Sequence, residues 1–540
     1  MDKQHRLLST RLFVKQAEVE VVLNRAVLSW RKIQKNTKGD SDISCTDTTV
    51  SQVVQVSEIV SVQKTEEGHL QASRRKSSAK QPNQLFTNAF TVSYVRRASK
   101  HQWCCTDVEF LCPDQSTCEQ WIRAISDQLT LLTNRPKRLL VYINPIGGKK
   151  QGKWIYDQKV APLFHKACIS TDVIVTERAN HAREHLVTEA DLDKYDGLVC
   201  VGGDGMFSEI VHGLVTRTQN DNKVDLNDPG AELVPTALRI GIIPAGSTDC
   251  ICFSTVGTND PVTSALHIIV GDAQPMDVCS VHHNDFFLRF SVSLLGYGFY
   301  GDVLSDSEKK RWLGPARYDL AGVKTFLNHN HYEGTVSFLP AEDDVSSPRD
   351  KVQCRSGCRV CQHTSGEKKK TEKDRRDDGW TVISGKFMAI NAACMSCACP
   401  RSPKGLSPSA HLADGTADLI LVRKCSRIDF FKHLLRHTNK DDQFDHVFVD
   451  VHRVKKFKFQ PRHVVSVEDL SEIPMKNTFT PVCPTPCRCN NDSAQSSWTC
   501  DGEILPHVSI QVSVQCQLIH LFARGIEETQ EQQQFVFEEL

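Results

Sequence analysis

A single carboxylate, Asp204, stands in a glycine-rich turn, GGDG at residues 202–205, between an apolar run and a helical pattern. Glycine lets the backbone approach a phosphate closely, and the free N–H groups at the start of a helix are donors to an anion. An aspartate beside a phosphate is repelled unless it has a task, such as accepting the proton of an attacking hydroxyl or helping to hold Mg²⁺. The alternative is an ordinary strand-to-helix turn in which Asp204 caps the helix.

Three other turns follow strand-like runs in the same way. They are NPIGGK at 144–149 after 138–143, TERAN at 176–180 after 171–175, and PAGSTD at 244–249 after 238–243. Lysines after the first of these turns would add positive charge near the same anion. Four strand-then-loop units predict a parallel α/β sheet whose ligand lies at the carboxyl ends of the strands.

The motifs NPxGGK, GGDGxxxE and PAGST, at these spacings, resemble those of the diacylglycerol kinase catalytic-domain family, in the branch that holds sphingosine and ceramide kinases. The resemblance covers residues 135–524. It implies ATP-dependent phosphorylation of a lipid hydroxyl, with ATP and Mg²⁺ as cofactors and the primary hydroxyl of ceramide as acceptor. An additional N-terminal domain, the segment SEKKRWLG at 307–314 and a cysteine pattern at 354–361 favour ceramide. The alternatives are a sphingosine or diacylglycerol kinase, or a non-catalytic membrane adaptor that keeps the fold.

The resemblance also implies roles for particular residues. Asp204 would be the general base that takes the proton of the lipid hydroxyl. Arg311 and Arg317 would reach the nucleotide phosphates, for which a planar guanidinium is suited, and a solvated helix face is the alternative explanation of their segment. The residues implied to bind ATP are Asn144, Pro145, Ile146, Gly147, Gly148, Thr176, Glu177, Arg178, Ala179, Asn180, Glu209, Gly246, Ser247, Thr248, Arg311, Arg317, Asp501, Gly502 and Glu503. Those implied to contact the lipid substrate are Gly202, Gly203, Asp204, Gly205 and Asp302.

Charge and hydropathy restrict where such an enzyme would work. The chain has 65 Lys and Arg against 65 Asp and Glu, so no overall field attracts nucleic acid, and we expect no nucleic-acid partner. No apolar run reaches the roughly 18 residues of a spanning helix, and the first residues lack a signal-peptide core. We therefore expect a cytoplasmic protein that attaches peripherally to the plasma membrane or the Golgi.

The pattern predicts three domains, of class α/β plus β. Residues 1–134 alternate short β-like runs with polar turns and end in an amphipathic helix that carries Trp121. This resembles a pleckstrin homology domain, a β-barrel with a C-terminal helix. Residues 135–279 are the predicted parallel α/β ATP-binding domain, and residues 280–540 are a predicted β-rich lipid-binding domain.

Pleckstrin homology domains commonly bind phosphoinositide headgroups through basic residues in their first hairpins. The basic residues in question are Lys15, Arg25, Arg31 and Lys32. We expect the N-terminal domain to contact a membrane surface through them, and scattered surface charge is the alternative.

The β-rich domain contains a charged, cysteine-containing insertion at about 341–379, which we expect to be mobile because it is too polar to pack. Cys354, Cys358 and Cys361 lie in it, and further cysteine groups follow at 394–399 and 483–489. Thiolates at such spacing could hold zinc, yet no single segment supplies four ligands at standard spacing. Reduced cysteines used for packing or membrane contact are the alternative.

A basic amphipathic stretch at 426–437 places Phe430, Phe431, Leu434 and Leu435 on one helical stripe. Such a helix can bind calmodulin or a membrane surface. The family resemblance favours calmodulin, with Ca²⁺ as the regulator, and a helix docked on its own domain is the alternative.

Overall fold

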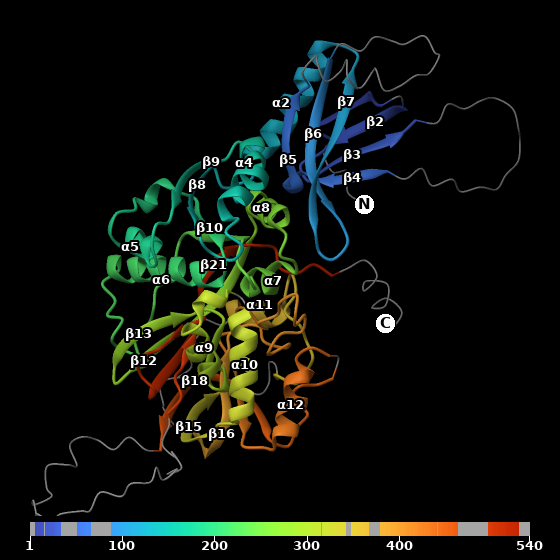
Figure 1. The fold of residues 1–540 in the computed structure, drawn as a ribbon. Coiled ribbons are helices and arrows are strands. Elements are labelled where there is room, and N and C mark those ends of the chain that lie inside the picture. The colour runs from blue at the N-terminus through green and yellow to red at the C-terminus, as the bar shows by residue number, and fades with distance from the viewer. Residues whose placement is uncertain are drawn as a thin grey trace, which may run out of the picture.

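The computed structural model describes residues 6–15, 17–33, 51–65, 88–314, 316–341, 347–366, 379–439, 441–462 and 495–528. Figure 1 shows the N-terminal domain at one end, the α/β domain in the middle and the β-rich domain at the other end. This arrangement confirms the predicted class of α/β plus β.

The N-terminal domain is one antiparallel sheet in the order β4-β3-β2-β1-β7-β6-β5, packed against helix α2 (Gln115–Thr130). Asp114 caps α2 by accepting a hydrogen bond from the backbone N–H of Thr117. The buried Trp121 of α2 lies parallel to Phe90, and its Nε1 donates to Thr10 Oγ1 at 2.7 Å. The predicted pleckstrin-homology-like domain is therefore confirmed. Its strands are β1 (Leu8–Val14), β2 (Ala17–Leu23), β3 (Val27–Lys32), β4 (Gln52–Gln55), β5 (Ile59–Lys64), β6 (Asn88–Arg97) and β7 (Trp103–Cys112).

The middle domain is built on four parallel strands, as predicted, and their order in the sheet is β11-β10-β8-β9. Alternate residues of these strands pack against α5 and α6 on one face and against α4 and α8 on the other, because side chains alternate along a strand. The strands are β8 (Arg138–Ile143), β9 (Ser170–Val175), β10 (Gly197–Gly202) and β11 (Arg239–Pro244). The helices are α3 (Gly152–Ile155), α4 (Ala161–Lys166), α5 (His181–Thr188), α6 (Asp204–Asp221), α7 (Cys250–Val256) and α8 (Pro261–Val270).

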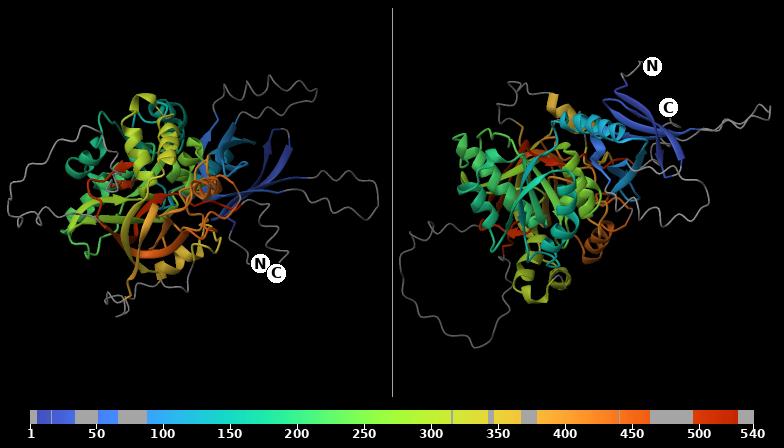
Figure 2. Two further views of the ribbon diagram at one scale, coloured as in Figure 1. Left: turned by 60° about the horizontal axis from the view of Figure 1, so that its bottom comes forward. Right: turned by 90° about the horizontal axis from the view of Figure 1, so that it is seen from above.

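The β-rich domain is continuous with the parallel sheet through its last strand, β21 (Ile510–Phe522). β21 runs parallel to β11, with His520 opposite Arg239, and antiparallel to β12 and β18. Figure 1 shows β21 between the α/β domain and the β-rich domain, and Figure 2 shows red C-terminal segments among the elements of both domains. The predicted boundary at residue 279 is thus not a clean division, since the chain returns to complete the first sheet.

The remaining elements of this domain follow. The strands are β12 (Ala273–His283), β13 (Phe286–Ser291), β14 (Leu294–Gly298), β15 (Tyr332–Pro340), β16 (Thr381–Ala393), β17 (Ala417–Arg423), β18 (Val449–Pro461), β19 (Thr499–Cys500) and β20 (Glu503–Ile504). The helices are α9 (Phe299–Glu308), α10 (Ala316–Asn328), α11 (Arg359–Gly366) and α12 (Arg427–Arg436). Within the described ranges, no helix is long and apolar enough to cross a membrane.

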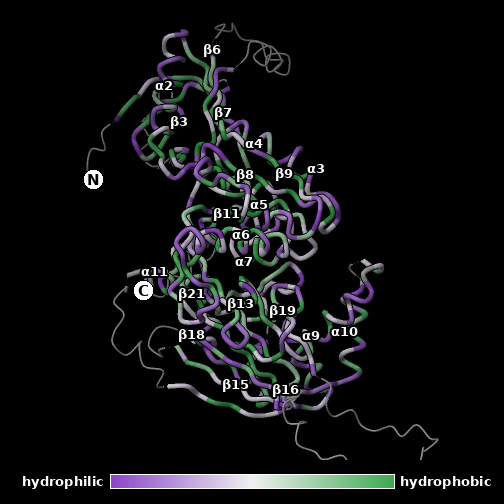
Figure 3. Tube along the Cα trace, turned by 90° about the vertical axis from the view of Figure 1, so that its left-hand side faces the viewer, coloured by the Kyte–Doolittle hydropathy of each residue, from purple (hydrophilic) through white to green (hydrophobic). Residues whose placement is uncertain are grey.

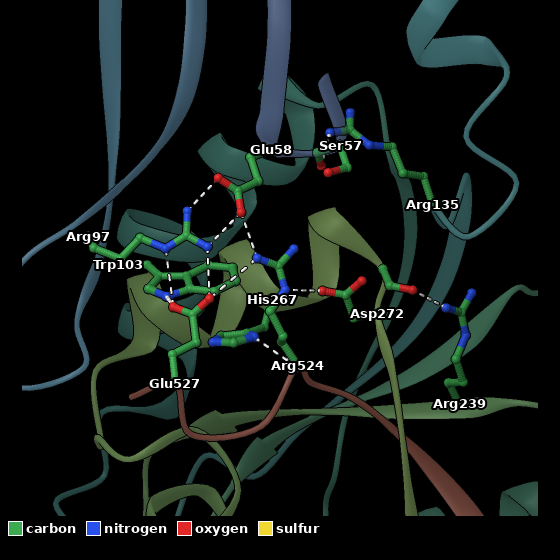
Figure 4. A network of polar contacts seen from close by, with 11 residues as sticks. Ser57, Glu58, Arg97, Trp103, Arg135, Arg239, His267, Asp272, Arg524 and Glu527 are labelled. Atoms are coloured by element: carbon green, nitrogen blue, oxygen red, sulfur yellow. Dashed lines mark hydrogen bonds and ion pairs between the residues drawn. The ribbon is translucent and has the colours of Figure 1, made fainter. Parts of the chain in front are cut away.

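Polar contacts fix the N-terminal domain to the other two (Figure 4). Arg97 lies between Glu58 and Glu527 and bonds to both, and Arg524 donates to Glu58 at 2.6 Å and to Asp272 at 2.6 Å. Trp103 donates from Nε1 to Glu527 at 3.1 Å. Because this junction is partly buried and charged on both sides, removal of the whole N-terminal domain would leave unpaired charges behind.

Candidate active site

The four predicted turns meet at the carboxyl edge of the parallel sheet. The N–H of Asn144 donates to Val201 O at 3.0 Å, the N–H of Thr176 to Ile143 O at 2.9 Å, and the N–H of Ala245 to Gly202 O at 3.0 Å. Each turn is therefore tied to the neighbouring strand. The structure brings together the predicted residues of these turns, 144–148, 176–180, 202–205 and 246–248.

Glycine is required where two of these turns touch. A Cβ added to Gly246 would lie 2.5 Å from the Cα of Gly203, and one added to Gly148, whose φ is +56°, would lie 2.5 Å from Ala245 O. Carbon atoms of real side chains do not approach so closely, so a larger residue would push the turns apart.

Asp204 is the first residue of α6, but it does not cap that helix. Its carboxylate accepts hydrogen bonds from the backbone N–H groups of Cys250, at 3.1 Å, and Ile251, at 2.9 Å, at the start of α7. The N-cap of α6 is Gly203, which has no side chain to accept a bond. The first N–H groups of α6 therefore have no side-chain cap, as an anion site requires.

The environment of Asp204 favours the protonated carboxyl more than water does. Burial raises its pKa, the hydrogen bonds from Ile251 and Cys250 lower it, and the negative charge of Asp501 raises it further. The pKa remains above the ordinary value, which brings it nearer to neutrality, where a general base is most effective.

A second carboxyl, Asp249, lies beside this site and was missed by the sequence analysis. It closes the PAGSTD turn with a φ of +53°, and its Oδ1 accepts from the N–H of Gly246 at 2.9 Å. Burial raises its pKa to about 7, with a further contribution from the charge of Asp204. Its position directly after the PAGST motif is the sequence feature that could have identified Asp249 as a site residue.

The pH dependence of turnover should report the ionisation of Asp204. Asp204 must be ionised to accept a proton, so activity should be lost as the pH falls through its raised pKa. The acid limb of kcat/KM should therefore lie at a higher pH than the ordinary Asp pKa of about 3.9. A kcat/KM that does not fall as the pH is lowered from 7 to 4 would contradict this role of Asp204.

Glu209 holds the turn at 176–180. Its Oε1 accepts from the N–H of Ala182 at 2.9 Å, and it also receives the N–H groups of Asn180 and Arg183, so that it caps α5. Burial raises the pKa of Glu209. It therefore positions the turn, and a direct contact of Glu209 with nucleotide stays a prediction.

Asp501 has a structural role in addition to the one implied for it. Its buried carboxylate accepts from the backbone N–H groups of Val292, Ser293 and Leu294 at 2.8–3.1 Å, which fixes the connection from β13 to β14. Ser208 of α6 also donates to it, at 3.4 Å. Of the predicted loop at 501–503, only Gly502 and Glu503 are exposed, and contact of this loop with nucleotide stays a prediction.

Asp302, in the first turn of α9, lies on the β-rich side. It accepts hydrogen bonds from Tyr332 at 2.5 Å and from Ser496 at 2.6 Å. Tyr300, two residues earlier, is half-buried and packs against the core that contains Met388 and Ala389 of β16. The two hydroxyls fix the position of the Asp302 carboxylate, and a contact of Asp302 with the lipid stays a prediction.

Of the two arginines predicted to bind phosphate, the structure describes side-chain contacts only for Arg317. Arg317 donates to its neighbour Tyr318 at 2.7 Å and pairs with Glu308 at 3.4 Å. Arg311 begins a short 3-10 helix, and its side chain lies outside the described part of the chain. No contact among the described residues joins either arginine to Asp204, so their role stays a prediction.

Comparisons with known proteins agree with this geometry. Residues 8–125 match the model of the ceramide kinase PH domain, residues 138–281 that of the diacylglycerol kinase catalytic domain, and residues 292–536 that of the ceramide kinase C-terminal domain. The chain is 54% identical to ceramide kinase of Homo sapiens over 96% of this chain and 97% of that protein. It is 53% identical to ceramide kinase of Mus musculus, over 88% and 90%, and 31% identical to ceramide kinase of Oryza sativa subsp. japonica, over 82% and 86%. With its three domains matched in order along nearly the whole length of these relatives, the chain belongs to the ceramide kinase family.

Proposed function

We propose that this protein transfers the γ-phosphoryl group of ATP to the primary hydroxyl of ceramide, giving ceramide 1-phosphate and ADP. The observation that carries the proposal is Asp204, a carboxylate held by two backbone N–H groups at the edge of a glycine-lined anion site. The choice of ceramide rests on the similarity to relatives named ceramide kinase.

Asp204 would activate the lipid hydroxyl for attack on ATP. An alcohol is a weak nucleophile at neutral pH, so a carboxylate within hydrogen-bond reach takes its proton as the phosphoryl group is transferred in line. The N–H groups of Cys250 and Ile251 fix the direction in which the carboxylate points.

The anion site would stabilise the negative charge of the ATP phosphates. The start of α6 and the turns that carry Gly148 and Gly246 would receive the phosphates of ATP through backbone N–H groups. With Asp204 kept for the proton, the carboxylate of Asp249 is the oxygen ligand that would hold Mg²⁺, which neutralises phosphate charge when it is bound.

A direct test measures ADP release with one lipid at a time. Ceramide should stimulate ADP formation, and sphingosine and diacylglycerol should do so weakly. If no lipid stimulates ADP formation while ATP still binds, the chain is an adaptor and not a kinase.

We further propose that the enzyme reaches ceramide by lying on the membrane surface with helices α10 and α12 against the bilayer. Two apolar stripes on these helices, which we call the outer apolar surface, are exposed to solvent. The ring of Phe326 lies 5.9 Å from that of Phe431, which places the helices side by side, and Figure 3 shows α10 at the periphery of its domain. Exposed apolar patches of this kind mark membrane or protein contacts. The outer apolar surface consists of Leu320, Val323, Leu327, Ile428, Phe431 and Leu435.

Of the four basic residues proposed for headgroup binding, two remain suited to it. Arg31 is paired with Glu20 at 2.6 Å, and Arg25 lies in the turn after β2, at the opposite end of the hairpin from Lys15. Lys15 and Lys32 lie at the same end and are exposed, so they would supply the second, electrostatic contact with an anionic membrane.

The calmodulin prediction meets a packing constraint. Phe430 of α12 is buried, and its ring lies 5.1 Å from that of Phe299. A partner that enclosed the whole helix would have to remove Phe430 from this core. Calmodulin binding at 426–437 and regulation by Ca²⁺ therefore stay predictions outside the proposed function.

Charge placed on the outer apolar surface should separate membrane contact from chemistry. The double variant Val323→Glu/Phe431→Glu should lower phosphorylation of long-chain ceramide in vesicles by roughly tenfold, because two buried apolar contacts with lipid are worth about 1.4 kcal/mol or more. Phosphorylation of a water-soluble short-chain ceramide should stay near wild type. Leu131→Glu, which changes an equally exposed apolar residue of the N-terminal domain, is the matched control. Equal activity of the double variant on both substrates would contradict membrane contact at this surface.

A further inference from the structure

Four potential metal ligands converge beside the C-terminal strand. The sulfurs of Cys354, Cys358 and Cys361 and a ring nitrogen of His411 all lie within 4.8 Å of one another. Cys354 Sγ lies 3.8 Å from Cys361 Sγ, and Cys358 Sγ lies 3.3 Å from His411 Nδ1. Cys361 and His411 are buried, and the other two side chains are half-buried.

These separations match the geometry of one particular ion. Around a tetrahedral zinc with Zn–S of about 2.3 Å and Zn–N of about 2.0 Å, two sulfurs lie about 3.8 Å apart and a sulfur and a nitrogen about 3.5 Å apart. Three thiolates and one imidazole are a common ligand set of structural zinc sites. Thiolates are soft ligands, so such a site does not suit Mg²⁺ or Ca²⁺, which prefer oxygen ligands.

We propose that Cys354, Cys358, Cys361 and His411 bind one structural zinc ion. All four positions of a tetrahedral ion are taken by protein ligands, so no position is open for water or substrate, and the site is not catalytic. A Cys354–Cys361 disulfide would use only two of the four groups and would leave unexplained why His411 comes from a segment 53 residues beyond Cys358 to meet them.

The surroundings of the ion show what it would stabilise. Cys361, in the first turn of α11, packs against the core that contains Leu412 and Leu518. Gln517 of β21 donates to the carbonyls of Cys361, at 3.2 Å, and Ala413, at 3.1 Å. The ion therefore joins the insertion, the loop between β16 and β17, and the strand that completes the parallel sheet.

The insertion also contacts the segment that holds the N-terminal domain. The N–H of Ser356 donates to Ile526 O at 2.9 Å, and the next residue, Glu527, bonds to Arg97 and Trp103. Loss of the ion should therefore loosen the contact that fixes the N-terminal domain, in addition to destabilising the β-rich domain.

Metal analysis of the purified full-length protein tests the proposal independently of activity. We expect one zinc per chain after dialysis. His411→Ala should lose most of it, whereas His411→Cys, which restores a fourth ligand, should retain it. Cys168→Ser, a change at an exposed cysteine outside the cluster, is the control and should keep one zinc per chain.

A measurement on the wild-type protein guards against variants that fail to fold. Exchange of the native ion for Co²⁺ should give the thiolate-to-metal charge-transfer absorption and the intense d–d bands of a tetrahedral cobalt site. Absence of zinc and of a Co²⁺ spectrum in the wild type, a Cys354–Cys361 disulfide in a metal-free protein, or full zinc retention in His411→Ala would each overturn the proposal.

Discussion

Replacement of Asp204 by Asn should lower turnover by about 10² or more while ATP affinity stays near that of the wild type. The amide keeps the shape of the side chain, and its oxygen can still accept a hydrogen bond from Cys250 or Ile251. It cannot accept the proton of the lipid hydroxyl. Steady-state ADP release and equilibrium ATP binding measure the two quantities separately.

Asp114→Asn is the matched control for this variant. Asp114 also accepts a backbone N–H, at the start of α2, and Asn serves equally well as a cap. Its turnover should equal that of the wild type. If Asp204→Asn retained near-normal turnover, Asp204 would not be the general base.

Gly246→Ala should lower both ATP affinity and turnover by roughly 10- to 100-fold. The added Cβ would lie 2.5 Å from the Cα of Gly203 and 2.6 Å from Asp249 Oδ1, both of which belong to the turns proposed to bind phosphate. Overpacking of this kind costs about 1–3 kcal/mol, which corresponds to that range of affinity. ATP titration and initial rates of the purified variant provide the measurement.

Gly322→Ala supplies the control for a glycine-to-alanine change. Gly322 lies on α10 with nothing within 4 Å of an added Cβ, so the variant should fold and bind ATP as the wild type does. A Gly246→Ala protein with normal ATP affinity would show that the two turns do not form the phosphate site.

The parts of the site that depend on local sequence were predictable. Strand β10, the glycine turn after it and Asp204 are consecutive in the chain, so hydrophobic pattern and glycine spacing identify them together. The parallel sheet was predictable from four repeats of the same strand-then-loop unit. The position of Asp204 in the turn was predictable, but its hydrogen bonds to α7 were not, because those donors lie more than 40 residues away.

Features that depend on distant contacts were missed or predicted wrongly. The return of β21 to pair with β11 joins residues about 280 apart, which no local pattern reports. The described part of the insertion, 347–366, which we expected to be too polar to pack, contacts the core through the buried Cys361 and the half-buried Cys354 and Cys358. His411 was missed for the same reason, since spacing rules consider ligands within one segment. The cysteines at 483–489 lie outside the described residues.

A competition measurement tests the central claim most directly. Vesicles that contain equal amounts of ceramide, sphingosine and diacylglycerol are incubated with the protein and γ-labelled ATP, and the labelled lipids are separated. We predict that nearly all of the label enters ceramide 1-phosphate with the wild-type protein and that the rate of this labelling falls by about 10² or more with Asp204→Asn. Label that enters mainly sphingosine or diacylglycerol, or labelling of ceramide that stays near the wild-type rate in the Asp204→Asn variant, would contradict the account.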